Sequence, residues 1–554
     1  AGAGRGVNVT VSSGTLTAIR DPDLSTTSYA YDAGFANRAN IQTNPRGGTL
    51  TVSFDSGGKV VSAATSVGTG QAYQTITTTF RPLETRGMAS VGDGRAVDTA
   101  SAYAQVNGPR TDVGDSTLFW LDKWGAPRTI RNAEGRETRI TRAEATYPAL
   151  VTTLKLPSAQ VLTATYDGRG NIATVVDSAT SVGGTFATTR YAWDAVWDFV
   201  TKIVPPELDS VTFAYDASTG NRRWQRNAIG DTVTFRYTTD GMLRASDGPL
   251  APPDTVLYDA LLKNVAEVRT PTGFATRFLR DSAGRDTLVT SPSDSLRRYL
   301  TTQRTTYDVM DRPLISKTWA DSAQAPFVAS DSLIVTNFYN ADGQLDSLRR
   351  QAKPDPESIG TMTTRWRYDL AGRVVLETAP DARTDSTIYD PAGNVIRAIT
   401  RRRDTLKTEY DVLSRPVRRI IPQVDYAIWS TSPFGGFPLY PNDGSSGYRI
   451  VTDTATFAYD TAGNLVTARN GDARVRRVFN VNGTLASEQL IIRPVVGWDS
   501  TKHVTTIAYG YDKSGRRTFL KHPVNLAPAP GKDTTRYEYD AAGRLTAVRD
   551  PYGN

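Results

Sequence analysis

Two pairs of carboxylates are the residues of this sequence best placed for acid–base or metal chemistry. Asp308 lies close before Asp311, and Asp381 lies close before Asp385. Paired carboxylates can act as a general acid and base, or they can hold a cation. Asp is also a turn residue, because its carboxylate accepts hydrogen bonds from nearby backbone N–H groups. We interpret both pairs as turn caps and predict no catalytic residue and no metal site.

Other reactive side chains are scarce. The 554 residues contain two His, His503 and His522, and no Cys, which excludes disulfides, thiolate metal sites and Cys nucleophiles. The sequence contains no EF-hand loop, zinc signature, phosphate-binding glycine loop or nucleophile elbow. We interpret both His as structural. The sequence therefore predicts a protein that is not an enzyme and that binds no cofactor.

The dipeptide Tyr-Asp recurs along the chain, and its spacing is the main feature of the sequence. It begins at Tyr31, Tyr166, Tyr215, Tyr258, Tyr307, Tyr368, Tyr389, Tyr410, Tyr459, Tyr511 and Tyr539. Three of these copies follow one another at intervals of 21 residues. A fixed period of this size is typical of a repeat architecture, in which stacked neighbours bury one another.

The fullest copies read Tyr-Asp-x-x-Gly followed by Arg or Asn, which is the composition of a tight turn. Asp can cap the turn, and Gly supplies the positive φ that closes it without a Cβ clash. We assign the structural repeat motif to Tyr368, Asp369, Gly372, Arg373, Tyr389, Asp390, Gly393, Tyr459, Asp460, Gly463, Tyr539, Asp540, Gly543 and Arg544.

The segments that lead into these turns alternate with period two. Val211, Phe213 and Tyr215 alternate with Thr212 and Ala214. Such alternation, rich in aromatic and β-branched residues, is typical of a strand with one covered face. A second turn falls in mid-period, as in residues 132–136. Each period is therefore predicted to be strand, turn, strand, turn, which gives about 50 short strands over the whole chain at ~22 residues per repeat.

On these motifs the sequence resembles the YD-repeat, or Rhs, family. That family includes bacterial Rhs toxins, the C component of Tc toxin complexes and the shell domain of teneurins. The resemblance implies an all-β fold in which one continuous antiparallel β-sheet strip spirals into a hollow barrel or cocoon. The family's aspartate-based cleavage segment is matched only by Asp550-Pro551-Tyr552-Gly553, without the Leu that should follow. No catalytic aspartate is therefore transferred to this chain.

The chain divides into four segments by the clarity of the repeat. Residues 1–120 carry degenerate repeats, residues 121–420 carry the regular repeats, and residues 450–554 carry further repeats cut in mid-period. Residues 421–449 contain no copy and are predicted to form an inserted loop. Its aromatic residues are a possible binding loop for a glycan or protein partner, or they fold back on the sheet: Trp429, Phe434, Phe437 and Tyr440.

Composition limits the partners. Charges of both signs are interspersed, with 64 basic and 57 acidic residues and a net charge of +7. The basic clusters at 401–403 and 474–477 lack a stacking array of aromatic residues, so we predict no nucleic-acid partner. No apolar run approaches the ~20 residues of a transmembrane helix. An apolar content of 39% suits a thin sheet better than a thick solid core.

These features lead to alternative functions. The favoured hypothesis is a non-enzymatic structural shell that encapsulates a C-terminal effector, a toxin, which is absent from this chain. The alternative is an extracellular or cell-surface adhesion or assembly module (a tube, filament or spacer), which pairs with copies of itself or binds carbohydrate. Both hypotheses place the protein outside the cell or on its surface. Because the sequence starts and stops in mid-period, we expect it to be the ordered part of a larger protein.

Overall fold

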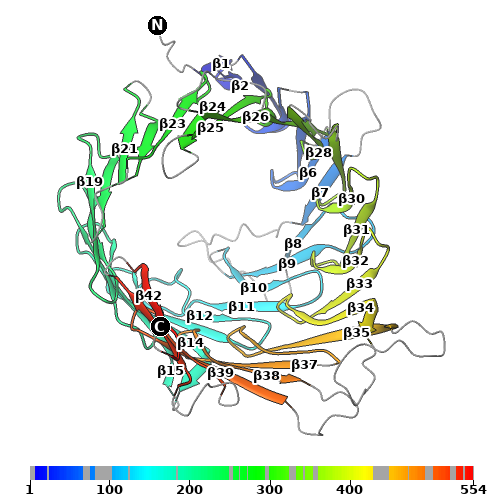
Figure 1. Ribbon diagram of the computed structural model, residues 1–554. Helices are drawn as coiled ribbons and strands as arrows, with labels where there is room; N and C mark the ends of the chain where they lie inside the picture. Colours follow the sequence, from blue (N-terminus) through cyan, green and yellow to red (C-terminus); the bar gives the residue numbers. More distant parts are fainter. Residues whose placement is uncertain are drawn as a thin grey trace. The chain divides into compact units, whose positions relative to one another are not determined.

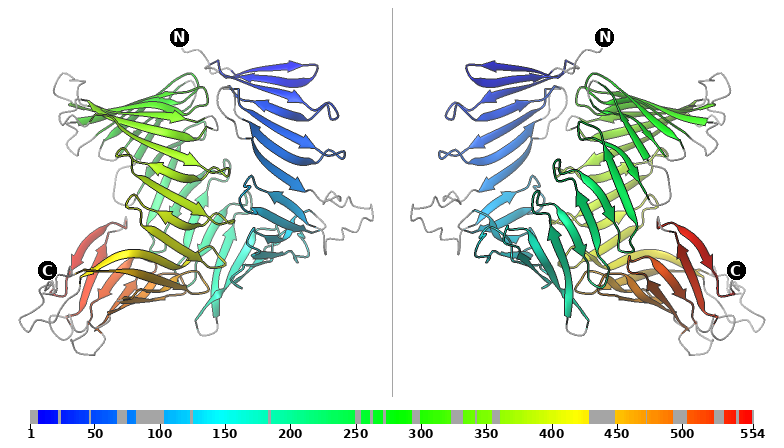
Figure 2. Two further views of the ribbon diagram at one scale, coloured as in Figure 1. Left: turned by 90° about the vertical axis from the view of Figure 1, so that its right-hand side faces the viewer. Right: turned by 90° about the vertical axis from the view of Figure 1, so that its left-hand side faces the viewer.

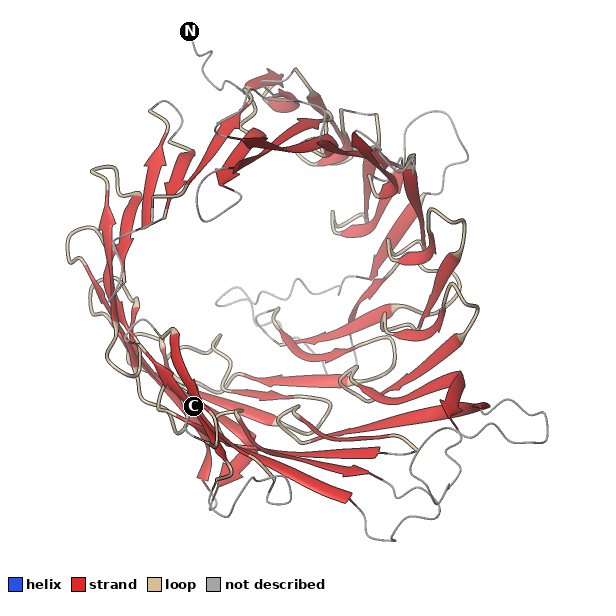
Figure 3. Cartoon of the chain, viewed as in Figure 1, coloured by secondary structure: helices blue, strands red, loops and turns tan. Residues whose placement is uncertain are grey.

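The computed structural model describes most of the chain, and every regular element in the described part is a strand (Figure 3). The described residues are 7–21, 24–45, 47–66, 75–81, 103–122, 125–182, 185–248, 254–260, 263–270, 273–292, 299–322, 332–340, 343–353, 360–427, 448–471, 473–492, 503–523, 532–540 and 543–552. Within these ranges no helix is long and apolar enough to cross a membrane.

The strands are numbered in chain order, and Figure 1 labels many of them. The first twenty-one are β1 (Asn8–Ser12), β2 (Thr15–Arg20), β3 (Thr26–Tyr31), β4 (Ala39–Thr43), β5 (Thr49–Phe54), β6 (Val60–Ser66), β7 (Ile76–Arg81), β8 (Ala104–Asn107), β9 (Ser116–Leu121), β10 (Pro127–Arg131), β11 (Glu137–Thr141), β12 (Thr153–Lys155), β13 (Val161–Tyr166), β14 (Ile172–Val182), β15 (Thr185–Trp193), β16 (Val200–Val204), β17 (Val211–Tyr215), β18 (Arg222–Arg226), β19 (Thr232–Tyr237), β20 (Leu243–Asp247) and β21 (Asp254–Tyr258).

The remaining strands are β22 (Val265–Arg269), β23 (Ala275–Arg280), β24 (Asp286–Pro292), β25 (Tyr299–Tyr307), β26 (Pro313–Ser322), β27 (Ser332–Tyr339), β28 (Leu345–Lys353), β29 (Met362–Tyr368), β30 (Val374–Thr378), β31 (Thr384–Tyr389), β32 (Val395–Ile399), β33 (Thr405–Tyr410), β34 (Pro416–Ala427), β35 (Tyr448–Tyr459), β36 (Leu465–Arg469), β37 (Ala473–Phe479), β38 (Leu485–Ile492), β39 (His503–Tyr511), β40 (Arg517–Lys521), β41 (Thr534–Tyr539) and β42 (Leu545–Arg549).

The 42 strands belong to one sheet. Each pair of strands whose register is defined is antiparallel and consecutive in the chain, for example β29 with β30 and β41 with β42. Figure 2 shows this as a ladder of successive strands, most openly at the blue N-terminal end. The predicted fold class, an all-β protein built from one continuous antiparallel strip, is confirmed. The strand total refers to the described residues, whereas the expectation of about 50 referred to the whole chain.

Contacts between Cα atoms divide the chain into two compact units, and each unit is made of segments distant in sequence. Unit 1 consists of Ala1–Gly125, Arg236–Asp247 and Ala251–Thr387, and unit 2 consists of Ala126–Phe235, Gly248–Leu250 and Ile388–Asn554. Within each unit, an early part of the strip therefore lies against a later part. The division of the sequence into four consecutive segments remains a prediction, and it does not anticipate this grouping.

The sheet has little core on either face. Among the described apolar residues, only Ala187, Ala245 and Ala379 are buried, and no large side chain is completely buried. In β29, Tyr368 is half-buried whereas Arg365 and Arg367 are exposed. We call the face that carries Tyr368 and the equivalent tyrosines the tyrosine face, and the other the opposite face. Both faces thus remain partly open, as in a single-layer wall.

The inserted segment is shorter than expected from the sequence. Strand β34 continues to Ala427 and β35 begins at Tyr448, so residues 421–427 and 448–449 pair as sheet rather than forming a loop. The register shifts between Ile421 and Val424, where the pairing passes over an irregularity. The four aromatic residues of the possible binding loop, Trp429, Phe434, Phe437 and Tyr440, lie outside the described residues.

Candidate functional site: the network of YD turns

Each complete YD turn is organised around one carboxylate, as the turn at Asp369 illustrates. The Asp369 N–H donates to the carbonyl of Arg373 (2.9 Å), and the Gly372 N–H donates to the carbonyl of Asp369 (2.9 Å). Asp369 Oδ1 accepts the N–H of Ala371 (2.9 Å) and of Arg373 (3.0 Å). Asp369 Oδ2 accepts Nε (2.9 Å) and Nη2 (2.6 Å) of the Arg373 guanidinium. The carboxylate therefore fixes both the turn and the start of the next strand.

The same pairing recurs in other copies. The Asp and the residue four positions later form an ion pair at Asp281–Arg285, Asp308–Arg312, Asp411–Arg415, Asp512–Arg516 and Asp540–Arg544. Where Asn replaces Arg, its side-chain amide donates to the same carboxylate oxygen, as in Asp390–Asn394 (2.8 Å) and Asp460–Asn464 (3.0 Å). The mid-period turn uses an amide in the same way, since Asn132 Oδ1 accepts the N–H of Glu134 and of Arg136.

The glycine position of the turn needs a left-handed backbone. Gly372 has φ of 79°, and a Cβ there would lie 3.1 Å from Gln344 Nε2. Left-handed backbone costs a residue with a Cβ about 1–2 kcal/mol. Asp311 and Ser414 occupy this position in two copies, with φ of 61° and 60°. These two turns therefore tolerate strain that Gly372 avoids.

The tyrosine hydroxyl has a role that the sequence does not reveal. At the end of its strand it donates to a backbone carbonyl at, or just before, the start of an earlier neighbouring strand, as in Tyr368 to Leu345 (2.7 Å). Eleven tyrosines make this bond at 2.6–3.0 Å: Tyr31, Tyr166, Tyr215, Tyr258, Tyr307, Tyr339, Tyr368, Tyr410, Tyr459, Tyr511 and Tyr539. Each of these residues thus ties one hairpin to the one before it.

In two copies of the motif, the residue before the turn Asp is not tyrosine but still donates a hydrogen bond to a backbone carbonyl. Trp193 precedes Asp194, and its indole Nε1 donates to the carbonyl of Ile172 (2.7 Å). Arg280 precedes Asp281, and its guanidinium donates to the carbonyl of Val265 (2.5 Å). In these two copies a long side chain other than tyrosine therefore makes the same kind of hydrogen bond. For Arg280 the sequence signal is the Asp-x-x-Gly turn that follows it at residues 281–284.

The arginine of one turn also reaches the tyrosine of the next copy. The guanidinium carbon lies 4.2 Å from the ring centroid in Arg312–Tyr339 and 4.4 Å in Arg415–Tyr459. The same contact occurs in Arg285–Tyr307 and Arg516–Tyr539. A cation within about 6 Å of an aromatic ring is attracted by the ring's quadrupole. Each such arginine thus pairs with its own turn Asp and stacks on the next tyrosine, so neighbouring copies depend on one another.

Burial and hydrogen bonding shift the pKa values of the repeat tyrosines and of the turn aspartates. Burial is the main reason why the pKa of Tyr368 lies above its usual value, and the same holds for Tyr215, Tyr307, Tyr339, Tyr410 and Tyr459. For Asp308, burial raises the pKa, but hydrogen bonds from the Arg312 side chain and from backbone N–H groups outweigh it, so the pKa is lowered overall. The network therefore favours neutral tyrosine and charged aspartate.

Within unit 2, residues of the earlier segment contact turns of the later one. Thr461 Oγ1 donates to the carbonyl of Ala179 (2.6 Å). Lys513 Nζ lies 3.2 Å from Asp209 Oδ2, and the Asp209 N–H donates to the Lys513 carbonyl (3.3 Å). We call these contacts the seam of unit 2.

A third seam contact contains a carboxyl pair. Arg136 Nη1 donates to Ser414 Oγ (3.3 Å) and Arg136 Nη2 pairs with Glu134 (2.6 Å). Burial, followed by the hydrogen bond and charge of Asp390, raises the pKa of Glu134. These seam contacts are therefore polar, and both side chains and backbone groups make them.

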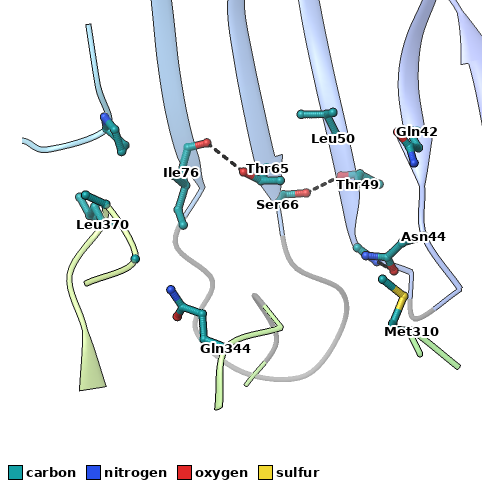
Figure 4. A pocket seen from close by; sticks show the side chains of 14 residues that line it. Gln42, Asn44, Thr49, Leu50, Thr65, Ser66, Ile76, Met310, Gln344 and Leu370 are labelled. Atoms are coloured by element: carbon teal, nitrogen blue, oxygen red, sulfur yellow. Dashed lines mark hydrogen bonds between the residues drawn. The ribbon is translucent and has the colours of Figure 1, made fainter. Parts of the chain in front are cut away.

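Unit 1 contains a cavity of about 600 Å³. Figure 4 shows side chains that line it. It lies between β4–β7 and later turns that contribute Met310, Gln344 and Leu370. Thr49 Oγ1 and Ser66 Oγ, which line it, are hydrogen-bonded to each other (2.6 Å). The described residues that line it are polar and uncharged or apolar. It is a gap between two parts of the strip.

The structure places Asp308, Asp311 and Asp381 in turns, as predicted, whereas the prediction of a turn position is wrong for Asp385, which lies in strand β31. Asp308 holds Arg312 and the N–H of Met310, while Asp311 pairs with Arg285 of the preceding copy (2.7 Å). Asp381 accepts the backbone N–H of Arg383 (3.1 Å). Asp385 lies opposite Glu377 in the strand pair β30–β31. In the described residues no group of three His, Asp or Glu could hold a metal ion.

The two histidines are not brought together as a site. His522 Nε2 lies 2.8 Å from Thr535 Oγ1, and its backbone N–H donates to the carbonyl of Asp533. His503 begins β39, where it pairs with Ile492. In the described part of the chain, the polar and charged side chains that interact most closely therefore lie in the repeated turns, and they do not converge in one pocket.

Comparison with known proteins finds a match to a repeat model at one end of the chain and solved structures with a similar fold. A family model described as RHS Repeat matches residues 529–554. The crystal structure of TcdB2-TccC3 is similar over 98% of this chain and 33% of that chain, with a TM-score of 0.57 and 14% identity. TcdB2-TccC3 without the hypervariable C-terminal region is similar over 98% of this chain and 35% of that chain (TM-score 0.53, 13% identity).

The Photorhabdus luminescens Tc holotoxin pore is similar over the same shares of the two chains, with a TM-score of 0.53 and 13% identity. The chain thus spans about a third of the length of the structures it matches. No curated protein matches the sequence. The repeated Tyr-Asp turns, the Rhs repeat matched at residues 529–554 and the shared fold all agree with the resemblance to the YD-repeat, or Rhs, family that the sequence motifs indicate.

Proposed function

We propose that this chain is the wall of a hollow, non-enzymatic shell that encloses a C-terminal effector polypeptide. The single observation that carries the proposal is the absence of a solid core in the described residues. Only three small alanines are buried there among the apolar residues, in a sheet of 42 strands. A single-layer sheet of this length gains stability from neighbouring strands instead. Such a sheet suits a wall around an enclosed space.

The similar solved structures support the proposal by analogy. One of them is described as lacking a hypervariable C-terminal region, so the relative carries a variable segment at that end. Another is the pore state of a Tc holotoxin. By this analogy the partners are an effector polypeptide and other toxin subunits, and the protein is secreted. The network of turns would act as structure, since each carboxylate is engaged by its own turn.

Small-angle X-ray scattering of the chain tests the hollow shape. A compact globule of 554 residues has a radius of gyration of about 24 Å. A hollow shell of the same mass places its atoms farther from the centre, so its radius of gyration should exceed that value clearly. The distribution of interatomic distances should also be shifted to long distances. A radius of gyration near the globular value would refute the shell.

The mass of the protein as its native source makes it tests the enclosure. A product clearly heavier than 60.2 kDa, with a C-terminal part that proteases reach only after denaturation, would support an enclosed effector. A heavier product whose extra part is digested under native conditions would contradict it. A product of 60.2 kDa that associates with copies of itself would instead favour the alternative, an extracellular adhesion or assembly module.

A further inference from the structure

We propose that the opposite face of strands β25–β29, in unit 1, binds an acidic polypeptide segment. Five basic side chains mark this surface, which we call the cationic face: Arg304, Lys317, Arg349, Arg365 and Arg367. Four of them are exposed, and Lys317 is half-buried beside Trp319. The proposal concerns a surface of the sheet and does not depend on whether the chain encloses an effector.

The strand registers place these side chains together. Arg304 lies directly opposite Lys317 in the pair β25–β26. Thr336 lies opposite Arg349 in β27–β28, and Ser347 lies opposite Arg365 in β28–β29. Because side chains alternate between faces along a strand, all five point to the face away from the tyrosines. Neighbouring strands are about 4.8 Å apart, so the cations span roughly 19 Å across the sheet.

Among the side chains that the structure describes, no carboxylate balances the charge of this face. No carboxylate stands among the side chains that the structure describes at the paired positions of this face in β25–β29. None of the five cations is in an ion pair with a described residue. Like charges directly opposite each other, as in Arg304 and Lys317, destabilise a strand pair. An anionic ligand between them would remove that repulsion.

Neighbouring strands show how the fold balances such charges elsewhere. On the same face of β22 and β23, Glu267 pairs with Arg269 (2.5 Å) and with Arg277 (2.8 Å). On β33 and β34, Glu409 pairs with Arg418 (2.7 Å). The cationic face lacks a comparable glutamate. The excess of positive charge is therefore specific to strands β25–β29 and is not shared by these other parts of the sheet.

Apolar side chains between the cations favour a polypeptide as the ligand. Ile315 is 43% exposed and Phe338 is 41% exposed on the same face. Such residues can contact the apolar side chains of a peptide, whereas a nucleic acid would use free aromatic faces for stacking. The Arg349 guanidinium already lies 5.2 Å from the centroid of Phe338, and Lys317 Nζ lies 5.7 Å from that of Trp319. Guanidinium groups match carboxylates in a two-pronged geometry.

Fluorescence anisotropy of a labelled 20-residue peptide, rich in Glu with interspersed Leu, tests this surface on the complete chain. A peptide with Gln in place of Glu and a single-stranded oligo-dT of equal length are the comparison ligands. We expect the acidic peptide to bind at low salt, to bind at least tenfold tighter than the Gln peptide, and to weaken as salt is added.

Matched variants locate the binding. Changing Arg349, Arg365 and Arg367 to Gln should weaken binding of the acidic peptide at least tenfold. The control changes Arg350, Arg402 and Arg403 to Gln, which removes the same charge. Arg350 is the exposed neighbour of Arg349 on the other face of β28, and the other two are exposed in a turn. The control should change the affinity less than twofold, and circular dichroism should show both variants folded.

Three results would overturn the proposal. Equal weakening in the two triple variants would mean that net charge, and not this face, attracts the peptide. Tighter binding of oligo-dT than of the acidic peptide would assign the face to nucleic acid. Absence of binding at low salt would mean that the face is only a solvated surface. None of these outcomes bears on the scattering experiment for the shell, so the two proposals fail separately.

Discussion

Tyr368 shows how one side chain stabilises the repeat in two ways. Its half-buried ring lies on the tyrosine face of β29, and its hydroxyl donates to the carbonyl of Leu345 at the start of β28. The ring contributes apolar burial, while the hydroxyl donates a hydrogen bond to a backbone carbonyl near the end of the neighbouring strand. Replacement by another aromatic residue therefore separates the two contributions.

Changing Tyr368 to Phe should remove the hydrogen bond and keep most of the packing. We expect local opening of β28–β29 to become easier by about 1 kcal/mol, the usual net value of such a bond. Hydrogen exchange of the amides in these two strands measures this local stability. Tyr552 to Phe is the control, because this ring is 64% exposed. Equal protection in both variants would show that the Tyr368 hydroxyl contributes nothing.

Backbone conformation at the end of the turn gives a second residue-scale prediction. Changing Gly372 to Ala should destabilise its hairpin by about 1–2 kcal/mol, since φ is 79° there. Changing Ala382, with φ of 65°, to Gly should stabilise its own hairpin by about 0.5 kcal/mol, because the relief of strain exceeds the added chain entropy. Hydrogen exchange of the flanking strands measures both, and effects of the same sign would contradict the argument.

At the scale of the hairpin, the tyrosines make the sheet sensitive to alkali. The pKa of Tyr368 and of five equivalent tyrosines is raised in the folded state, mainly by burial. A raised pKa means that the neutral form stabilises the fold fully below about pH 10, the pKa of an exposed tyrosine. That stability is lost as the pH rises through the higher folded-state pKa values.

We therefore expect these tyrosines to ionise together with unfolding above pH 10. Tyrosinate absorbance at 295 nm and circular dichroism, recorded in one titration, should change in the same pH range. Full ionisation of every tyrosine with unchanged circular dichroism would contradict this prediction.

The turn carboxylates give the opposite dependence in acid. Hydrogen bonds from the Ser218 side chain and from the N–H groups of Thr219 and Ser218 lower the pKa of Asp216 to about 2. A lowered pKa means that the charged form stabilises the fold above about pH 4, and that this contribution is lost as the pH falls toward 2. An Asp216 to Asn variant should therefore lose less stability between pH 4 and pH 2 than the parent, as urea midpoints would show.

The sequence predicted these elements unevenly. The Tyr-Asp spacing predicted strands that end at Tyr215, Tyr368 and Tyr459, because alternation and turn composition are local properties. The donor role of Trp193 and Arg280 was missed, because it depends on a carbonyl in the preceding strand. The extension of β34 to Ala427 was also missed, because pairing with β35 overrides a local composition that is typical of a loop.

At the scale of the whole molecule, the seam of unit 2 is open to direct test. Thr461 and Ala179 are joined by a hydrogen bond although 282 residues separate them. Contacts of this kind leave no periodic signal in a sequence, because the repeat does not specify which distant copy lies beside which. The composition of the two units could not be predicted for the same reason.

A pair of engineered cysteines can trap this contact. The chain contains no Cys, so a double variant with Cys at 179 and 461 should form one disulfide under oxidising conditions. Its faster migration in a non-reducing gel and the loss of two free thiols would confirm the seam. The control places Cys at 218 and 461 and should retain both thiols. A crosslink in the control alone would show that the strip is wound differently.

The order of strand pairing has a consequence for how the protein is made. Each strand with a defined register pairs with the one before it in the chain. A strand that leaves the ribosome thus finds its partner already present and needs no segment still to be synthesised. Loop closure between such neighbours is rapid and costs little entropy. The sheet can therefore grow at the pace of translation, and the tyrosine at the end of each strand can fasten it as soon as it emerges.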